Sequence, residues 1–257
     1  MLPREHRLFW HITDINNMPS VFKNGGLLSR DYLRGFDIRF QDNSDKKCTE
    51  KRERLGLSMF VPFHFIPWSP SDFSFMLKGK RRLSSFCYVT LDHPTAEELK
   101  AQIVLEGPSD KQYLDLHDLD DKVRPAIDER RRHTDFRNRH DRFHALGECL
   151  VFERVGPENF FLIVVESEDD REIVKMYQPS WAECPIFVKP GYFGITPEFA
   201  KDFCPPSLGK LTREDIVEAT KAVRLRQAKR AKRLPEPFPL FDERIDPNTG
   251  ERIFRIY

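Results

Sequence analysis

The chain has 257 residues, of which 39% are hydrophobic and 32% are charged, so it carries enough apolar mass for a folded core. Its 42 basic and 41 acidic residues leave a net charge of +1, which excludes a global field that would attract nucleic acid or membranes. Five cysteines without a C-x-x-C pair, and no apolar run as long as a signal peptide or membrane span, predict a cytoplasmic protein without a membrane segment.

The N-terminal part of the sequence predicts a strand, a helix, a charged segment and a second strand. Residues 8–13 alternate as a short strand, and Asp14 can cap the helix that follows. Residues 41–54 are polar and highly charged, which is typical of a mobile loop or an exposed helix. Residues 59–68, MFVPFHFIPW, predict a buried strand that Pro62 places at a sheet edge or a bulge.

Three further strands are expected at residues 86–91, 148–155 and 160–166. The second and third of these follow each other closely, and the sequence favours a hairpin between them. The long polar stretch 109–147 separates the first from the second. An insert of that length in a compact domain is usually functional.

The C-terminal part predicts a basic helix and a hairpin. The helix covers residues 212–233, and its second half, 221–233, holds seven basic residues and no acidic one. After a proline-rich linker the chain should turn at residues 248–250. We expect one domain over residues 1–210 and an appendage over 211–257. Part of the basic helix should contact the phosphates of a nucleic acid.

The common sequence motifs for cofactor and metal binding do not identify a site in this chain. Neither G-x-G-x-x-G nor G-x-x-x-x-G-K-[ST] occurs in the sequence, which excludes a Rossmann dinucleotide-binding site and a P-loop nucleotide site. His140 and His144, with His133 or Cys149 as a third ligand, have the spacing of a metal site on a helix. Because such spacing is common without metal, we expect no metal here.

Three segments are more informative: FWHITDINNMPSVFKNGGLLS, EKRERLGLSMFVPFHFIPWSP and ALGECLVFERV, in that order. Together they resemble the DarT family of DNA ADP-ribosyltransferase toxins. The family motifs are HIT-x-I-x-N-L-x-x-I-L-x-x-G-x-L, then E-R-R-x-R, V-P-F-Y-F-x-P-R-S-P and an A-E-F-L-V-like strand. The resemblance covers about residues 8–165. It implies an α/β (α+β) ADP-ribosyltransferase fold in which split mixed β-sheets flank a cleft for NAD+, the co-substrate.

The resemblance makes Glu148 the catalytic carboxylate. Breaking the bond between nicotinamide and ribose develops positive charge on the sugar, which a nearby carboxylate stabilises. Glu148 begins an apolar strand, where an unpaired carboxylate is costly. The alternative is a glutamate in water at a strand edge. By the same resemblance Arg54 binds the NAD+ pyrophosphate or prepares the target base, with Arg52 as the fallback and a solvated arginine as the alternative.

The resemblance also implies the residues that hold NAD+. His11 and Thr13 lie two apart on one strand, so both can hydrogen-bond to one ligand. A histidine of this kind, taken alone, is more often a satisfied core residue. The full set of implied cofactor-binding residues is His11, Ile12, Thr13, Ser20, Leu28 and Arg54.

The resemblance also predicts how single-stranded DNA is bound and which base is modified. A basic loop before the catalytic glutamate should present the substrate, with a solvated loop as the alternative; its residues are Arg137, Arg139, Arg142 and His144. Trp68 replaces the arginine of the family's P-R-S-P segment, which favours guanine over thymine as the target. The family implies a toxin whose antitoxin carries a macrodomain.

Three other functions remain open. One is an ADP-ribosyltransferase acting on RNA. Another is a non-catalytic nucleic-acid binding module that uses the run 221–233. The third is a ribonuclease-type toxin using His11, His144 and an arginine. Dependence on NAD+ separates the transferases from the other two.

Overall fold

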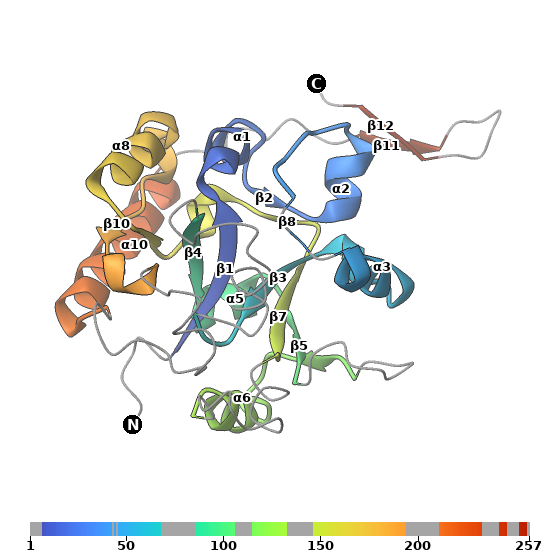
Figure 1. The fold of residues 1–257 in the computed structure, drawn as a ribbon, viewed down its shortest axis with the longest axis horizontal. Helices are drawn as coiled ribbons and strands as arrows, with labels where there is room; N and C mark the ends of the chain where they lie inside the picture. Colours follow the sequence, from blue (N-terminus) through green and yellow to red (C-terminus); the bar gives the residue numbers. More distant parts are fainter. Residues whose placement is uncertain are drawn as a thin grey trace.

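The computed structural model describes residues 7–42, 44, 46–67, 86–105, 115–132, 146–193, 211–232, 242–245 and 252–255. Its centre is an eight-stranded mixed sheet in the order β10-β9-β4-β1-β3-β7-β5-β6 (Figure 1). The strands of this sheet are β1 (Leu8–Asp14), β3 (Phe60–His64), β4 (Phe86–Asp92), β5 (Gln102–Val104), β6 (His117–Asp118), β7 (Glu148–Phe152), β9 (Ile163–Val165) and β10 (Ile186–Val188). No helix in the described ranges is long and apolar enough to cross a bilayer.

Two short strand pairs lie outside this sheet: β2 (Leu27–Leu28) with β8 (Arg154–Val155), and β11 (Asp242–Ile245) with β12 (Arg252–Arg255). The helices are α1 (Met18–Lys23), α2 (Arg30–Gly35), α3 (Lys46–Arg54), α5 (His93–Glu98), α6 (Arg124–Arg130), α8 (Glu168–Tyr177) and α10 (Arg213–Lys232). Short 3-10 turns are η2 (Ile15–Asn17), η3 (Leu57–Met59), η5 (Pro157–Asn159), η6 (Ser180–Ala182) and η7 (Pro190–Tyr192).

The sheet is covered on both faces. Alternate residues of β1 enter different cores, with Phe9 in one and Trp10 in the other. The first core is closed by apolar residues of α1, α5, α6 and α8. The second is closed by η7 and by Ile216 and Ala219 of α10. The first half of α10 therefore packs against the sheet.

The sheet is nearly divided between β1 and β3. Every residue of β1 pairs with β4, and every residue of β3 pairs with β7. Between β1 and β3, by contrast, the register holds a single pair, Trp10↔His64. The two strands diverge beyond that pair (Figure 1), so one sheet is built from two halves joined at a seam. The resemblance implied split sheets, whereas the structure has one mixed sheet whose two halves are joined by a single residue pair.

Pro62 was expected at a sheet edge or bulge, but β3 lies inside the sheet order. The Pro62 carbonyl oxygen accepts a hydrogen bond from the His11 ring in β1. The nitrogen and carbonyl of one strand residue face the same side, so the proline nitrogen also faces the open seam. No ladder bond is lost there, which is why an interior strand tolerates this proline.

The expected hairpin between residues 148–155 and 160–166 is wrong. β7 lies between β3 and β5, whereas β9 lies between β4 and β10 on the other half of the sheet. The chain leaves β7 at Glu153, whose φ is 54°, and then pairs with β2 as β8. It thereby crosses the seam before β9 begins, and the 3-10 turn η5 completes the crossing.

The charged segment 41–54 contains an exposed helix, α3, none of whose residues is buried. In the C-terminal part of the chain, Thr212 and Asp215 cap the N-terminus of α10. The backbone N–H of each donates a hydrogen bond to the side-chain oxygen of the other. The strands β11 and β12 pair with each other as predicted, and the turn at 248–250 falls outside the described residues. The boundary at residue 210 stays a prediction.

Candidate active site

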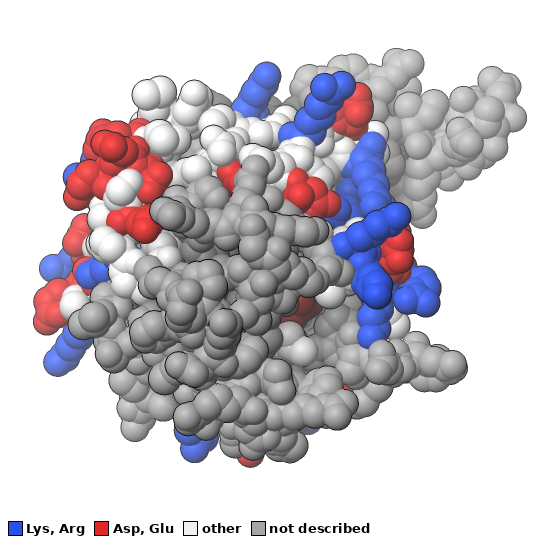
Figure 2. All heavy atoms as spheres, viewed as in Figure 1, with Lys and Arg blue, Asp and Glu red and all other residues white. Residues whose placement is uncertain are grey.

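A cavity of about 360 Å³ opens at the seam. It is lined from one side by β1, α1 and β2, and from the other by α3, η3, β3 and the first residue of β7. Figure 2 shows a hollow in this face beside a strip of basic side chains over α3. The divergence of β1 from β3 is thus what makes room for a ligand inside the sheet.

His11 lies in the seam. Its Nδ1 is 2.8 Å from the Pro62 carbonyl oxygen, and because a carbonyl only accepts, Nδ1 carries the proton. Burial lowers the pKa of His11 to about 4, helped by His64 and the cation of Arg52 and opposed by the Pro62 bond. The ring is therefore neutral near pH 7, and its Nε2 can accept a hydrogen bond from a hydroxyl.

Glu148 and Arg52 form the charged pair of the cavity. Arg52 Nη1 donates to Glu148 Oε2 at 2.5 Å, and both side chains are largely buried, with 18% and 8% exposed. The helix α3 brings the guanidinium over the start of β7, where the carboxylate begins the strand. A bond of this kind fixes the direction of the carboxylate, so that it can face a developing cation.

The structure brings Arg52, and not Arg54, to the carboxylate. Arg52 lines the cavity, whereas Arg54 is exposed and does not. Residues two positions apart on a helix point in directions that differ by about 200°. Only one of the two arginines can therefore face the seam. The resemblance favoured Arg54, with Arg52 as the fallback; the geometry favours Arg52, and the catalytic role of either arginine stays a prediction.

The remaining residues expected to hold NAD+ all line the cavity: Ile12, Thr13, Ser20 and Leu28. Thr13 Oγ1 accepts from Asn17 Nδ2 at 3.3 Å, and Ser20 Oγ accepts from Asn24 Nδ2 at 2.9 Å. Both hydroxyls are therefore already oriented by an amide. Their role in binding stays a prediction.

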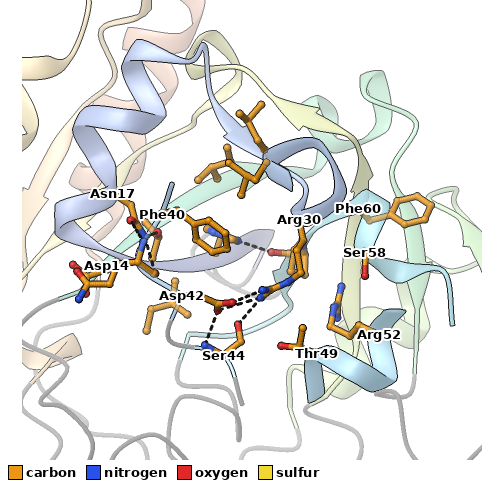
Figure 3. Close-up of a pocket in the computed structure, with 18 of the residues that line it drawn as sticks. Asp14, Asn17, Arg30, Phe40, Asp42, Ser44, Thr49, Arg52, Ser58 and Phe60 are labelled. Carbon is orange, nitrogen blue, oxygen red and sulfur yellow. Dashed lines mark hydrogen bonds and ion pairs between the residues drawn. The ribbon is translucent and has the colours of Figure 1, made fainter. Parts of the chain in front are cut away.

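One wall of the cavity was not anticipated from the sequence. Residues 40–42, together with Ser44, form a strap along its mouth, held by Arg30, which donates to both carboxylate oxygens of Asp42 and lies over the Phe40 ring (Figure 3). Asn17 fixes the same strap by exchanging hydrogen bonds with the backbone of Gln41. Burial of Asp42 would raise its pKa, but the hydrogen bonds from Arg30 and Ser44 outweigh it and lower the pKa. These contacts join residues far apart in the sequence, so no local sequence pattern predicted them.

Three buried polar atoms of the cavity lining have no hydrogen-bond partner among the described residues: Arg52 Nη2, Ser58 Oγ and His64 Nδ1. Each unsatisfied buried group costs about 1–3 kcal/mol, so a polar ligand that satisfies them gains affinity. A dinucleotide, with its many hydroxyl and phosphate oxygens, suits such a lining.

The loop expected to grip DNA, with Arg137, Arg139, Arg142 and His144, lies outside the described residues. Within the described ranges no group of three metal-binding side chains occurs. Cys149, the third ligand once considered for a metal, is buried in the core, where burial raises the pKa of its thiol.

A family model described as "ssDNA thymidine ADP-ribosyltransferase, DarT" matches residues 10–194. The structure is similar to Thermosipho africanus DarTG in complex with ADP-ribose, with a TM-score of 0.63 and 19% identity, over 73% of this chain and 51% of that chain. The chain thus spans about half the length of that protein.

Two Thermus sp. 2.9 DarT structures are similar as well. One is a complex with ADP-ribosylated ssDNA, with a TM-score of 0.62 and 16% identity over 75% of this chain and 99% of that chain. The other is a complex with NAD+, with a TM-score of 0.59 and 15% identity over 74% and 99%. A comparison with curated protein sequences found no match. These likenesses confirm the fold class expected from the sequence.

Proposed function

The chain belongs to the DarT family, and from this premise we propose that it is an NAD+-dependent mono-ADP-ribosyltransferase that modifies a base of single-stranded DNA. The observation that carries the proposal is the Arg52–Glu148 pair in a cavity that also holds a neutral His11. The similar Thermus structures hold NAD+ and ADP-ribosylated ssDNA, which supports the same ligands here.

The lining fits NAD+. His11 Nε2 can accept from a ribose hydroxyl, and the oriented hydroxyls of Thr13 and Ser20 can bind along the same molecule. Leu28 and Ile12 supply apolar contact. When bound, NAD+ supplies the ADP-ribosyl group and a nicotinamide leaving group.

Each charged residue has a distinct task in the proposed reaction. Glu148 faces the sugar, where positive charge develops as the nicotinamide bond breaks, and stabilises that charge electrostatically. Arg52 holds the carboxylate through Nη1 and keeps Nη2 for the substrate. Because both side chains are largely withdrawn from water, their charges act at reduced dielectric screening.

The base is the finer part of the proposal. The family description names thymidine, and the expectation of guanine from Trp68 finds no support in the comparisons. We therefore put thymine before guanine. The proposal also includes the toxin role and a macrodomain antitoxin, supported by the likeness to a DarTG protein.

Mass spectrometry of a mixed-sequence DNA oligonucleotide, incubated with protein and NAD+, tests the activity and reports the base together. We expect a single ADP-ribose per modified base, absent when NAD+ is omitted. An RNA copy of the same oligonucleotide tests the RNA alternative. Cleavage of either strand without NAD+ would instead favour the ribonuclease.

The variant Glu148→Gln is the control for this experiment. It keeps the shape and one hydrogen-bond acceptor but removes the charge, so we expect transfer to fall by on the order of 10²-fold or more. Its NAD+ affinity, measured by calorimetry, should change far less. Transfer near the wild-type rate would make the carboxylate structural.

A further inference from the structure

His64 occupies an unusual place beside the catalytic carboxylate. It ends β3, and in the β3–β7 register it is the residue directly opposite Glu148. Side chains directly opposite each other in an antiparallel pair have Cβ atoms about 4.5–5.5 Å apart. His64 lines the cavity, and a histidine stands here where the family motif V-P-F-Y-F has tyrosine.

The Nδ1 atom of His64 is buried and has no hydrogen-bond partner among the described residues. Arg52 Nη2 is in the same condition, and its sister atom Nη1 is 2.5 Å from Glu148 Oε2. The cavity lining that holds the carboxylate therefore also presents a guanidinium donor and an imidazole nitrogen, neither of which has a partner among the described residues. With its proton on Nε2, the imidazole presents a lone pair at Nδ1.

This pair of groups matches one class of nucleobase. Thymine and guanine carry a ring carbonyl next to a ring N–H, so they offer an acceptor beside a donor. Adenine and cytosine present an unprotonated ring nitrogen next to an amino group, the reverse order. A guanidinium donor beside an imidazole acceptor is complementary to the first class only.

Resting on the proposed function, we propose that His64 binds the ring N–H of the acceptor base and takes its proton, while Arg52 Nη2 donates to the adjacent carbonyl. The bond between the ribose carbon and nicotinamide breaks, and its electron pair leaves with nicotinamide. The base nitrogen forms the new bond to that carbon. Its proton passes to His64 Nδ1, which then releases it to water, so no further reactant is needed.

Two variants separate binding from proton transfer. His64→Gln can still accept a hydrogen bond but cannot take a proton, so kcat should fall by on the order of 10²-fold. Its KM for the oligonucleotide should stay within about threefold. His64→Leu can do neither, and its KM should also rise by about tenfold, the value of one hydrogen bond. His117→Gln, an exposed histidine of β6, is the matched control.

A binding measurement that needs no turnover completes the test. Protein labelled with ¹⁵N-histidine is held with carba-NAD+ and titrated with the 5′-monophosphates of thymidine, guanosine, cytidine and adenosine. The His64 nitrogen signal should shift with the first two and stay with the others. The His64→Gln spectrum assigns that signal.

The outcomes distinguish this inference from the function it rests on. If the wild type transfers ADP-ribose but His64→Gln keeps its kcat, the proton role is wrong and the function stands. If His64→Leu keeps its KM, or the signal shifts equally with all four nucleotides, base binding at His64 is wrong. If no transfer occurs at all but the signal still selects thymine and guanine, the subsite stands and the proposed function falls.

Discussion

Two arginines of one helix provide a matched pair at the scale of single residues. Arg52 contacts Glu148, while Arg54 is exposed two residues further on. We expect Arg52→Ala to lower kcat/KM by on the order of 10²-fold or more, because it releases the carboxylate and removes a buried donor.

Arg54→Ala should keep kcat within about twofold of the wild type, because the side chain does not line the cavity, and should raise only the KM for the oligonucleotide, through the lost phosphate contact. Kinetics of both variants with the same oligonucleotide make the comparison. A loss of kcat in Arg54→Ala as large as in Arg52→Ala would support the role that the resemblance implied for Arg54.

His11 makes stability depend on pH. Its pKa is about 4 in the folded protein and near 6.5 in the unfolded chain. Between these values the unfolded chain binds the extra proton, so the free energy of unfolding falls as pH drops from 6.5 to 4, by up to about 3 kcal/mol. Above pH 6.5 this contribution is fully present.

Urea unfolding of the wild type and His11→Gln across that range isolates the effect. The variant has no such group to titrate and should show a shallower slope, even though His93, whose pKa burial lowers to about 3, adds a slope of the same sign in both proteins. His117→Gln should retain the full wild-type slope. A His11→Gln curve parallel to the wild type would mean that the ring is not enclosed.

The resemblance implied Glu148 and His11, and the structure places both at one cavity. It favoured Arg54 over Arg52, because nothing within 41–54 indicates which face of the helix turns inward. His64 and Ser58 were missed for a related reason. Their significance lies in unpaired buried atoms, which only the packed structure makes visible.

At the scale of elements, the closed end of the seam is held by one buried side chain. Arg131, 3% exposed at the end of α6, donates from Nε to the Phe65 carbonyl at 3.0 Å and from Nη2 to the Leu8 carbonyl at 2.9 Å. The guanidinium also lies over the Phe9 ring and against His93. One fork thus ties the start of β1 to the chain just after β3.

Replacing this fork tests the clamp. Arg131→Lys keeps the charge but loses the fixed geometry, so it cannot satisfy both carbonyls, and we expect a loss of about 2–4 kcal/mol in the free energy of unfolding. Arg124→Lys, in an exposed ion pair with Glu97, should change it by no more than about 0.5 kcal/mol. Urea denaturation measures both. Equal stability of the two variants would show that the strands hold the seam unaided.

Element order shows where sequence reasoning stops. The existence of β1, β4 and β7 followed from local alternation, which is a property of neighbouring residues. Their pairing did not, because Glu153 and β8 carry the chain across the seam and replace the expected hairpin. Which strand pairs with β7 depends on contacts between residues far apart in the sequence. The short connection between residues 155 and 160 was therefore not enough to predict the pairing.

For the whole molecule, the question is which surface holds the DNA strand. The sequence pointed to the basic half of α10, but α10 and α3 lie on opposite sides of the molecule (Figure 1). Arg226 of α10 is also engaged, since its Nη2 donates to the Phe160 carbonyl at 2.6 Å. The basic strip beside the hollow in Figure 2 lies instead over α3, which carries Arg52 into the cavity.

We therefore expect the exposed cations of α3, rather than those of α10, to contact phosphates. Each contact with a single strand contributes about −0.7 to the slope of log affinity against log salt concentration. Replacing Lys46, Lys47 and Arg54 together with Gln should flatten that slope by about 2, without changing which base is modified, because phosphate contacts carry no sequence information. The matched change on α10, with Lys221, Arg224 and Lys229 replaced by Gln, should leave the slope as it was. Fluorescence anisotropy of a labelled oligonucleotide at several salt concentrations measures both, and a flattened slope in the α10 variant alone would move the DNA path to the other side of the molecule.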